Sequence, residues 1–228
     1  MTKILVVLTN TTRYHGTTDP TGLWLGEATE FVDEVTKAGF DVDYVSPKGG
    51  FVPLDPRSMK YVAESDMKIY ESSDFQNRAL MNSMNPSQID SKEYAAIYYT
   101  GGHGVMWDFP NNHELQKITM DIYNQGGYVT SVCHGIAGLL NVKTAKGDYL
   151  IKGKEITGFT TSEEILANKR KVVPFLNQKV ASDHGAIFRK KRAYKSYAVQ
   201  DGQLITGQNP FSARAVGKML VHQLKQSK

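Results

Sequence analysis

The only cysteine of this chain, Cys133, occupies a position suited to a nucleophile. It ends the run Tyr128-Val129-Thr130-Ser131-Val132, which predicts a strand, and small and apolar residues at helical spacing follow it. A sharp strand-to-helix turn would lift the thiol above the sheet, and the first helix amides would favour its anion and lower its pKa. The alternative is a small buried hydrophobic residue, the usual role of a free cysteine.

A second strand end, marked by glycines, lies upstream. The run Ala95-Ala96-Ile97-Tyr98-Tyr99 leads into Thr100-Gly101-Gly102-His103-Gly104. Two adjacent strand ends, one with glycine amides and the other with a thiol, would form an oxyanion pocket for acyl or carbonyl chemistry. We therefore expect Gly101, Gly102 and His103 to bind substrate, with the amides of Gly102 and His134 holding the oxyanion. The alternative for His103 is that it only packs the loop.

Strand and helix patterns alternate along the chain and predict an α/β fold. Continuous apolar or β-branched runs at 4–8, 42–45, 95–99 and 128–132 are typical of parallel strands with helices on both faces. Helical patterns end at Gly39 and before Gly126, and Asn209-Pro210 opens a final helix. We predict one domain, residues 1–228, with a doubly wound, mostly parallel sheet sandwiched by helices. Ligands of such sheets bind at the carboxyl ends of the strands.

One segment interrupts this alternation. Residues 53–90 are polar and contain Met and Ser without a strand pattern. Long non-repeating insertions often cover sites, so we predict a small helical cap or lid here, with a subunit contact as the alternative.

Composition restricts the class of protein. The chain has 228 residues, 40% hydrophobic and 22% charged, with a net charge of +4, as expected for a globular protein. The clusters Lys169-Arg170-Lys171 and Arg189-Lys190-Lys191-Arg192 lack interleaved aromatic residues, which indicates solvated surface and no nucleic-acid partner. The apolar run at 4–8 is too short for a signal peptide or a membrane span. A lone reactive thiol excludes an intramolecular disulfide framework and favours a cytoplasmic protein.

Similarity to a known family runs nearly end to end. The motifs that carry it are, in order, Gly22-Leu23-Trp24-Leu25-Gly26-Glu27-Ala28, Gly39-Phe40-Asp41-Val42-Asp43-Tyr44-Val45-Ser46-Pro47, Gly101-Gly102-His103-Gly104, Val132-Cys133-His134-Gly135, Ile156-Thr157-Gly158-Phe159-Thr160 and Leu204-Ile205-Thr206-Gly207-Gln208-Asn209-Pro210. Together they resemble the DJ-1/PfpI superfamily, and within it the Hsp31-like branch of glutathione-independent glyoxalases and stress proteins. The resemblance implies a flavodoxin-like fold, which class I glutamine amidotransferases share.

The resemblance also implies an activity and its residues. It implies a triad of Cys133, His134 and Glu164, with Glu27 of the first helix touching the thiol. Glu163 competes with Glu164, because only the spacing after Gly158-Phe159-Thr160 selects between them. The implied enzyme is a glyoxalase III-type lyase (D-lactate dehydratase) that needs no cofactor. It would convert methylglyoxal and related 2-oxoaldehydes to 2-hydroxy acids and would form a homodimer.

These residues suit the steps of that reaction. The Cys133 thiolate would add to the aldehyde, Glu27 or His134 would relay a proton between the adjacent carbons through an enediol, and water would hydrolyse the thioester. An ionised Glu27 would repel the thiolate. We therefore expect burial and the neighbouring anion to keep Glu27 protonated, so that it donates a hydrogen bond to sulfur.

Other functions use the same residues. A holdase chaperone or redox-stress protein would depend on apolar surface or on oxidation of Cys133, and a protein deglycase or peptidase would use the same thiol. An amidotransferase is disfavoured, because Gly207-Gln208-Asn209-Pro210-Phe211 lacks the His-Pro-Glu that completes the triad of those enzymes. His113 and Glu114 could offer metal ligands, but adjacent helical residues point about 100° apart and no third ligand is evident. We expect no metal.

Overall fold

Six strands form the central sheet of the computed structural model, which describes residues 3–226. They are β1 (Lys3–Val7), β2 (Asp41–Val45), β3 (Tyr94–Tyr99), β4 (Tyr128–Val132), β7 (Ala198–Asp201) and β8 (Leu204–Gly207). Their spatial order is β2-β1-β3-β4-β8-β7, and every neighbouring pair is parallel except β7 with β8. The predicted doubly wound, mostly parallel sheet is confirmed, with one antiparallel edge strand.

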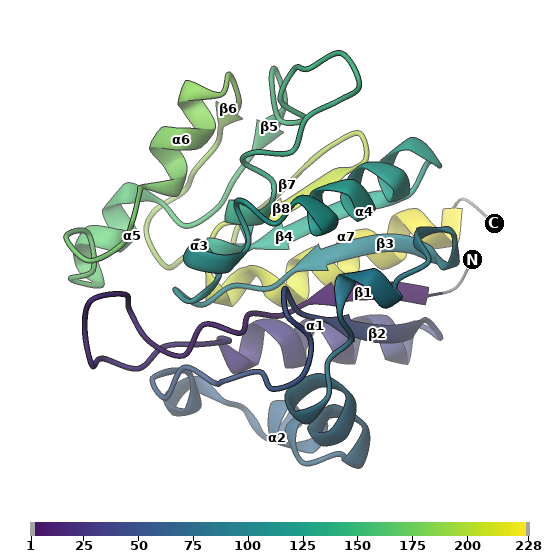
Figure 1. Ribbon diagram of the computed structural model, residues 1–228, viewed down its shortest axis with the longest axis vertical. Helices are drawn as coiled ribbons and strands as arrows, with labels where there is room; N and C mark the ends of the chain where they lie inside the picture. The colour runs from purple at the N-terminus through teal and green to yellow at the C-terminus, as the bar shows by residue number, and fades with distance from the viewer. Residues whose placement is uncertain (1–2, 227–228) are drawn as a thin grey trace.

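Helices cover both faces of this sheet, as Figure 1 shows. They are α1 (Leu25–Lys37), α2 (Glu64–Tyr70), α3 (Val105–Asp108), α4 (His113–Asn124), α5 (Thr161–Leu166), α6 (Asn177–Asp183) and α7 (Ala213–Gln226). A separate parallel pair, β5 (Glu155–Ile156) and β6 (Ile187–Phe188), lies beside α6. Short 3₁₀ segments occupy Ser58–Tyr61, Pro86–Gln88, Ser91–Glu93, Cys133–Gly138 and Pro210–Ser212, and Phe75–Met81 is π-helical.

Alternate residues of β1 enter two different hydrophobic cores. Ile4 and Val6 belong to the core that contains the apolar sides of α1 and α7. Leu5 and Val7 belong to the core that contains α4. Because strand side chains alternate between faces, a strand that is apolar at every position must be covered on both sides. The continuous apolar run at 4–8 therefore requires helices on both faces of the sheet.

The insertion at 53–90 contributes a wall to the site rather than a complete cover. Its helices α2 and Phe75–Met81 lie beside α1 and β2, at the bottom of Figure 1. Phe75, Ala79 and Leu80 extend the core on that side. The short stretch at 57–61 faces the cavity above Cys133. A lid that opens and closes stays a prediction.

The predicted site residues lie at the carboxyl ends of two parallel strands. Gly101 follows β3 and Cys133 follows β4, and these two strands are neighbours in the sheet. Both residues therefore lie at the same edge, the carboxyl edge at which doubly wound sheets bind ligands. Within residues 3–226, no helix is both long and apolar enough to cross a membrane.

Candidate active site

Cys133 lies on a strained turn directly after β4. Its φ is 56°, a left-handed conformation that residues other than glycine seldom adopt and that often accompanies function. Gly135 lets the turn pack closely, because a Cβ there would overlap the carbonyl oxygens of Tyr99 and Thr100. The thiol is almost completely buried but lines the floor of a cavity. The predicted nucleophile elbow thus has a matching backbone.

The prediction of a low thiol pKa is wrong for this structure. The segment after Cys133 is a 3₁₀ turn, Cys133–Gly138, rather than an α-helix, so its dipole is small. Burial, followed by the Glu27 carboxyl, raises the pKa of Cys133 well above the ordinary thiol value. The resting group is therefore the neutral thiol, which needs a base when it attacks.

That base is adjacent. The Nδ1 atom of His134 lies 3.4 Å from Cys133 Sγ, and its Nε2 atom lies 2.9 Å from Glu164 Oε2. In a neutral imidazole whose Nε2–H donates to the carboxylate, Nδ1 is left as an acceptor for the thiol proton. The structure therefore aligns a thiol, an imidazole and a carboxylate in the order that activates nucleophiles in acyl-transfer enzymes.

Glu164 also holds a second histidine. His103 Nε2 donates to Glu164 Oε1 at 2.7 Å, and the His103 ring lies 4.0 Å from the His134 ring, centroid to centroid. Burial, followed by the electrostatic effect of the adjacent His134, lowers the pKa of His103 to about 4, so His103 is a neutral donor. Burial opposes ionisation of Glu164, but the two histidines outweigh it and hold its pKa below the usual value. His103 lines the cavity, with its Nε2 turned to Glu164.

The structure separates the two competing glutamates. Glu164 forms the hydrogen bond to His134, whereas Glu163 Oε2 accepts hydrogen bonds from Thr160 N at 2.9 Å and Thr160 Oγ1 at 2.7 Å. These bonds cap the N-terminus of helix α5. In the first turn of this helix, Glu163 points into the protein core and Glu164 points towards the histidines. Gly158 allows this segment to approach, since a Cβ there would lie 3.2 Å from Cys133 O and closer to Ile136.

Glu27 is completely buried on the first turn of α1. Burial raises its pKa well above the usual carboxyl value, and the nearby Cys133 and Gly101 only partly oppose this shift. Its two oxygens have no hydrogen-bond partner within the usual distance limits among the described residues. A protonated carboxyl beside the sulfur accords with both observations. The expected hydrogen bond to sulfur is not formed within the usual distance limits, and Cys133 lowers rather than raises the pKa of Glu27.

The glycines after β3 make room for this pair. A Cβ on Gly101 would collide with Glu27 Oε2 and would lie 3.0 Å from His134 N. Gly102 has a φ of 101° and a Cβ there would lie 2.8 Å from Trp24 N. Only glycine fits either position, so the strand end reaches the backbone of the elbow. This proximity supports the predicted oxyanion role of the Gly102 and His134 amides, which stays a prediction.

A cavity of about 560 Å³ opens above Cys133. Its volume is within the range that holds small organic ligands. Its walls are aromatic and basic, and include Tyr14, Trp24, Tyr61, Phe159, Tyr194 and Phe211 together with Arg57, Lys60 and Lys169. Asp19 pairs with Arg57 and, at 2.6 Å, with Lys169, and so joins three separate segments at the rim. The expectation that Lys169 lies on solvated surface is wrong, because this side chain pairs with Asp19 and lines the cavity. Arg57 and Lys60 come from a segment without a motif, and no sequence signal marks them.

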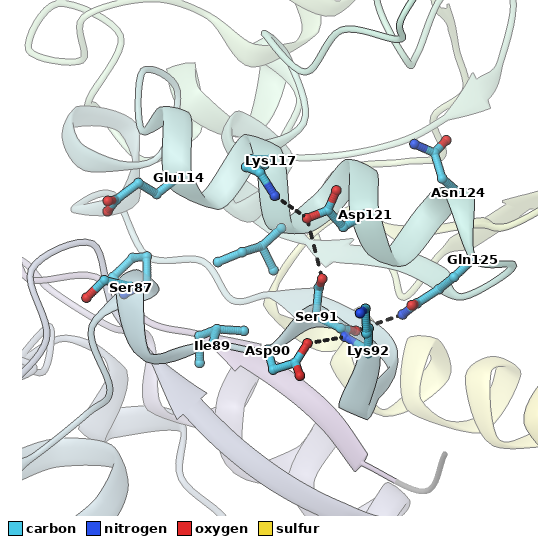
Figure 2. A pocket seen from close by; sticks show the side chains of 12 residues that line it. Ser87, Ile89, Asp90, Ser91, Lys92, Glu114, Lys117, Asp121, Asn124 and Gln125 are labelled. Atoms are coloured by element: carbon cyan, nitrogen blue, oxygen red, sulfur yellow. Dashed lines mark hydrogen bonds and ion pairs between the residues drawn. The ribbon is translucent and has the colours of Figure 1, made fainter.

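Another surface hollow, of about 720 Å³, lies away from Cys133 (Figure 2). It is lined by residues such as Ser91 and Lys92, which precede β3 at the amino edge of the sheet. Lys117 pairs with Asp121 at 2.7 Å there, and no cysteine or histidine is among its lining residues. Glu114 lines this hollow, whereas His113 lines another one, so the structure does not join the two as metal ligands. Among residues 3–226, His103, His134 and Glu164 are the group with metal-ligand spacing.

Sequence relatives, solved structures and a family profile all match this chain over most of its length. A glutathione-independent glyoxalase of Saccharomyces cerevisiae, HSP31, is 33% identical over 236 residues, covering 98% of each chain. The crystal structure of a 24 kDa rapid encystment protein of Francisella tularensis has a TM-score of 0.95 at 35% identity, covering 98% of this chain and 99% of that one. Glyoxalase III of Candida albicans has a TM-score of 0.85 at 31% identity, covering 96% of both. The profile of the DJ-1/PfpI family matches residues 22–223. This chain therefore belongs to the DJ-1/PfpI family.

Proposed function

We propose that this protein is a glutathione-independent glyoxalase that converts methylglyoxal and related 2-oxoaldehydes to 2-hydroxy acids. The observation that carries the proposal is the line Cys133 Sγ, His134 and Glu164, joined by contacts of 3.4 and 2.9 Å beside the buried Glu27. This arrangement can both add a thiol to an aldehyde and move a proton between carbons. The names of the yeast HSP31 and Candida glyoxalase III relatives support the same reaction.

The first step is addition of sulfur to the aldehyde carbon. His134 Nδ1 takes the thiol proton as the carbon–sulfur bond forms, and the carbonyl electron pair moves to oxygen. The amides of Gly102 and His134 stabilise that oxygen until Glu27 gives it a proton. The result is a hemithioacetal with a protonated His134 and an ionised Glu27.

The second step moves the aldehyde hydrogen. Glu27 removes it as a proton, the electron pair forms the carbon–carbon double bond of an enediol, and His134 protonates the keto oxygen. Glu27 then returns its proton to the second carbon while His134 takes the hydroxyl proton of the first. Water hydrolyses the resulting thioester, its proton goes to Glu27, and His134 reprotonates the sulfur. All three groups are thereby restored.

The direct test is incubation of the protein with methylglyoxal in the absence of glutathione, with enzymatic assay of D-lactate. We expect lactate to form in proportion to methylglyoxal consumed. Loss of methylglyoxal without lactate would show simple adduct formation and would contradict the proposal. Addition of glutathione should leave the initial rate unchanged, since the protein supplies the thiol.

Glu27→Gln should separate thiol reactivity from turnover. Gln keeps the shape of the side chain but cannot exchange a proton, so lactate formation should fall by about 10²-fold or more. Because the substitution removes an ionisable neighbour that raises the pKa of Cys133, alkylation at neutral pH should stay equal or become faster. Rates of iodoacetamide alkylation and of lactate formation, both measured against pH, check this. Unchanged turnover would leave His134 as the proton carrier.

A holdase activity is a second candidate, supported by apolar side chains at the rim of the cavity. Leu166 is 65% exposed, Tyr61 61% and Phe211 48%. Suppression of aggregation of a heated client protein should then persist in Cys133→Ser. Suppression that disappears with the thiol would instead tie it to the chemistry.

We also propose that the protein acts as a homodimer in the cytoplasm. Exposed Phe51 and Met81, which lie outside the cavity lining, give the protein apolar surface that a second copy could cover. The lone nucleophilic thiol favours a reducing compartment. Sedimentation velocity on the purified protein tests the dimer, and fractionation of cells that produce it tests the location.

A further inference from the structure

Tyr194 has an unusual backbone conformation for a bulky residue. Its φ is 57°, and Cys133 and Asn168 are the other residues besides glycine with a positive φ in the described chain. Such a conformation is strained and persists only when the surroundings impose it. The surroundings of Tyr194 therefore need an explanation.

A buried carboxylate imposes the conformation. Glu163 Oε1 accepts hydrogen bonds from Tyr194 N at 2.8 Å, Asn209 Nδ2 at 2.9 Å and Gln208 Nε2 at 3.0 Å. Asn209 Nδ2 also donates to Lys195 O at 2.8 Å, on the other side of Tyr194. The loop is thus fixed at two successive residues by polar groups that lie in the protein interior. Such a network fixes the backbone from which the Tyr194 side chain, 38% exposed, projects.

The side chain of Tyr194 lines the cavity above Cys133. Its ring meets the ring of Phe159 edge-on with centroids 6.1 Å apart, and Phe159 lies 4.2 Å from the His134 ring. The hydroxyl lies 3.5 Å from Glu163 O, at the distance limit of a hydrogen bond. This weak bond can break when the hydroxyl meets a better acceptor. Burial, followed by the electrostatic effect of the nearby Cys133, raises the pKa of Tyr194 to about 12, so the hydroxyl is a donor at neutral pH.

The reaction needs a donor at this place. When the aldehyde proton leaves, its electron pair forms the carbon–carbon double bond and the keto electron pair moves onto the second oxygen. The amides of Gly102 and His134 serve the first oxygen, so the charge on the second oxygen, which belongs to the adjacent carbon, needs another donor. A fixed donor there acts mainly in the transition state.

We propose that the Tyr194 hydroxyl donates a hydrogen bond to the keto oxygen of the 2-oxoaldehyde and stabilises the enediolate charge that develops there. Tyr194 keeps its own proton, and His134 later protonates the oxygen. The inference rests on the proposed glyoxalase function. It makes Tyr194 a further catalytic residue, which the Glu163 network holds in place.

Tyr194→Phe tests the inference, because it keeps the ring and removes only the hydroxyl. We expect kcat for methylglyoxal to fall about 10- to 100-fold, the size of a lost hydrogen bond to a developing charge, with KM changed by less than about threefold. The matched control is Tyr197→Phe, on the same loop but outside the cavity lining, which should behave as the wild type. The melting temperature and the alkylation rate of Cys133 should be unchanged in both variants.

An isotope effect distinguishes a chemical role from a structural one. With methylglyoxal deuterated at the aldehyde, the effect on kcat should be as large in Tyr194→Phe as in the wild type, or larger, because proton removal becomes slower. Wild-type kcat in Tyr194→Phe would overturn the inference while leaving the glyoxalase function intact. A lower kcat with a smaller isotope effect, or with altered alkylation of Cys133, would assign Tyr194 to packing and overturn it too. Absence of lactate with the wild-type protein would overturn both proposals.

Discussion

Replacing Cys133 by serine is expected to abolish lactate formation from methylglyoxal, with kcat/KM lower by at least about 10⁴-fold. Sulfur is activated here by His134 Nδ1 at 3.4 Å rather than by a low pKa, and a serine hydroxyl, which is far less acidic, would not be activated enough. The measurement is the initial rate of D-lactate formation over a range of methylglyoxal concentrations without glutathione. Mass spectrometry of the protein should show no substrate adduct at this position.

The folded structure should tolerate this change. Serine is smaller than cysteine, and the strained φ of 56° belongs to the backbone of the turn, so the melting temperature should change by only a few degrees. Circular dichroism and thermal unfolding provide this control. Turnover near that of the wild type would refute the nucleophilic role of Cys133 and with it the proposed mechanism.

Replacing Glu164 by glutamine is expected to lower kcat by about 10²- to 10⁴-fold. The carboxylate accepts the Nε2–H of His134 at 2.9 Å, which leaves Nδ1 free to take the thiol proton. If the Gln amide nitrogen faces His134, the proton moves to Nδ1 and the acceptor is lost. Michaelis–Menten kinetics with methylglyoxal measure the loss.

Glu163→Gln is the matched control on the adjacent residue. Gln keeps one amide oxygen, which can accept the three N–H donors at the Oε1 position, but its NH2 group then faces the Thr160 N–H that Oε2 accepts. Leaving such a donor unpaired costs about 1–3 kcal/mol. We expect the melting temperature to fall by about 2–12 °C, with a smaller loss of kcat than in Glu164→Gln. The residual loss should reflect misplacement of Tyr194. Equal losses of kcat in the two variants would show that the acid of the triad lies elsewhere.

The sequence by itself determined the frame of this protein. The continuous apolar run at 4–8 had to be buried on both faces, because its alternate residues point to opposite sides of a strand. Gly101 and Cys133 had to share an edge of the sheet, because each lies within two residues of the carboxyl end of a parallel strand. The ordered motifs then placed the chain in its family, which the match over residues 22–223 confirms. Local periodicity and chain order were sufficient for these conclusions.

Only the tertiary structure decided the chemistry at Cys133. The predicted low thiol pKa came from local helix amides, but the turn is 3₁₀ and burial with Glu27 raises the pKa instead. Spacing could not choose between Glu163 and Glu164, because adjacent helical residues point about 100° apart and the choice depends on what packs against each. Helix α5 turns Glu164 to the histidines and Glu163 to the loop of Tyr194. Desolvation and long-range hydrogen bonds depend on residues far apart in the chain, and therefore they could be determined only from the folded protein.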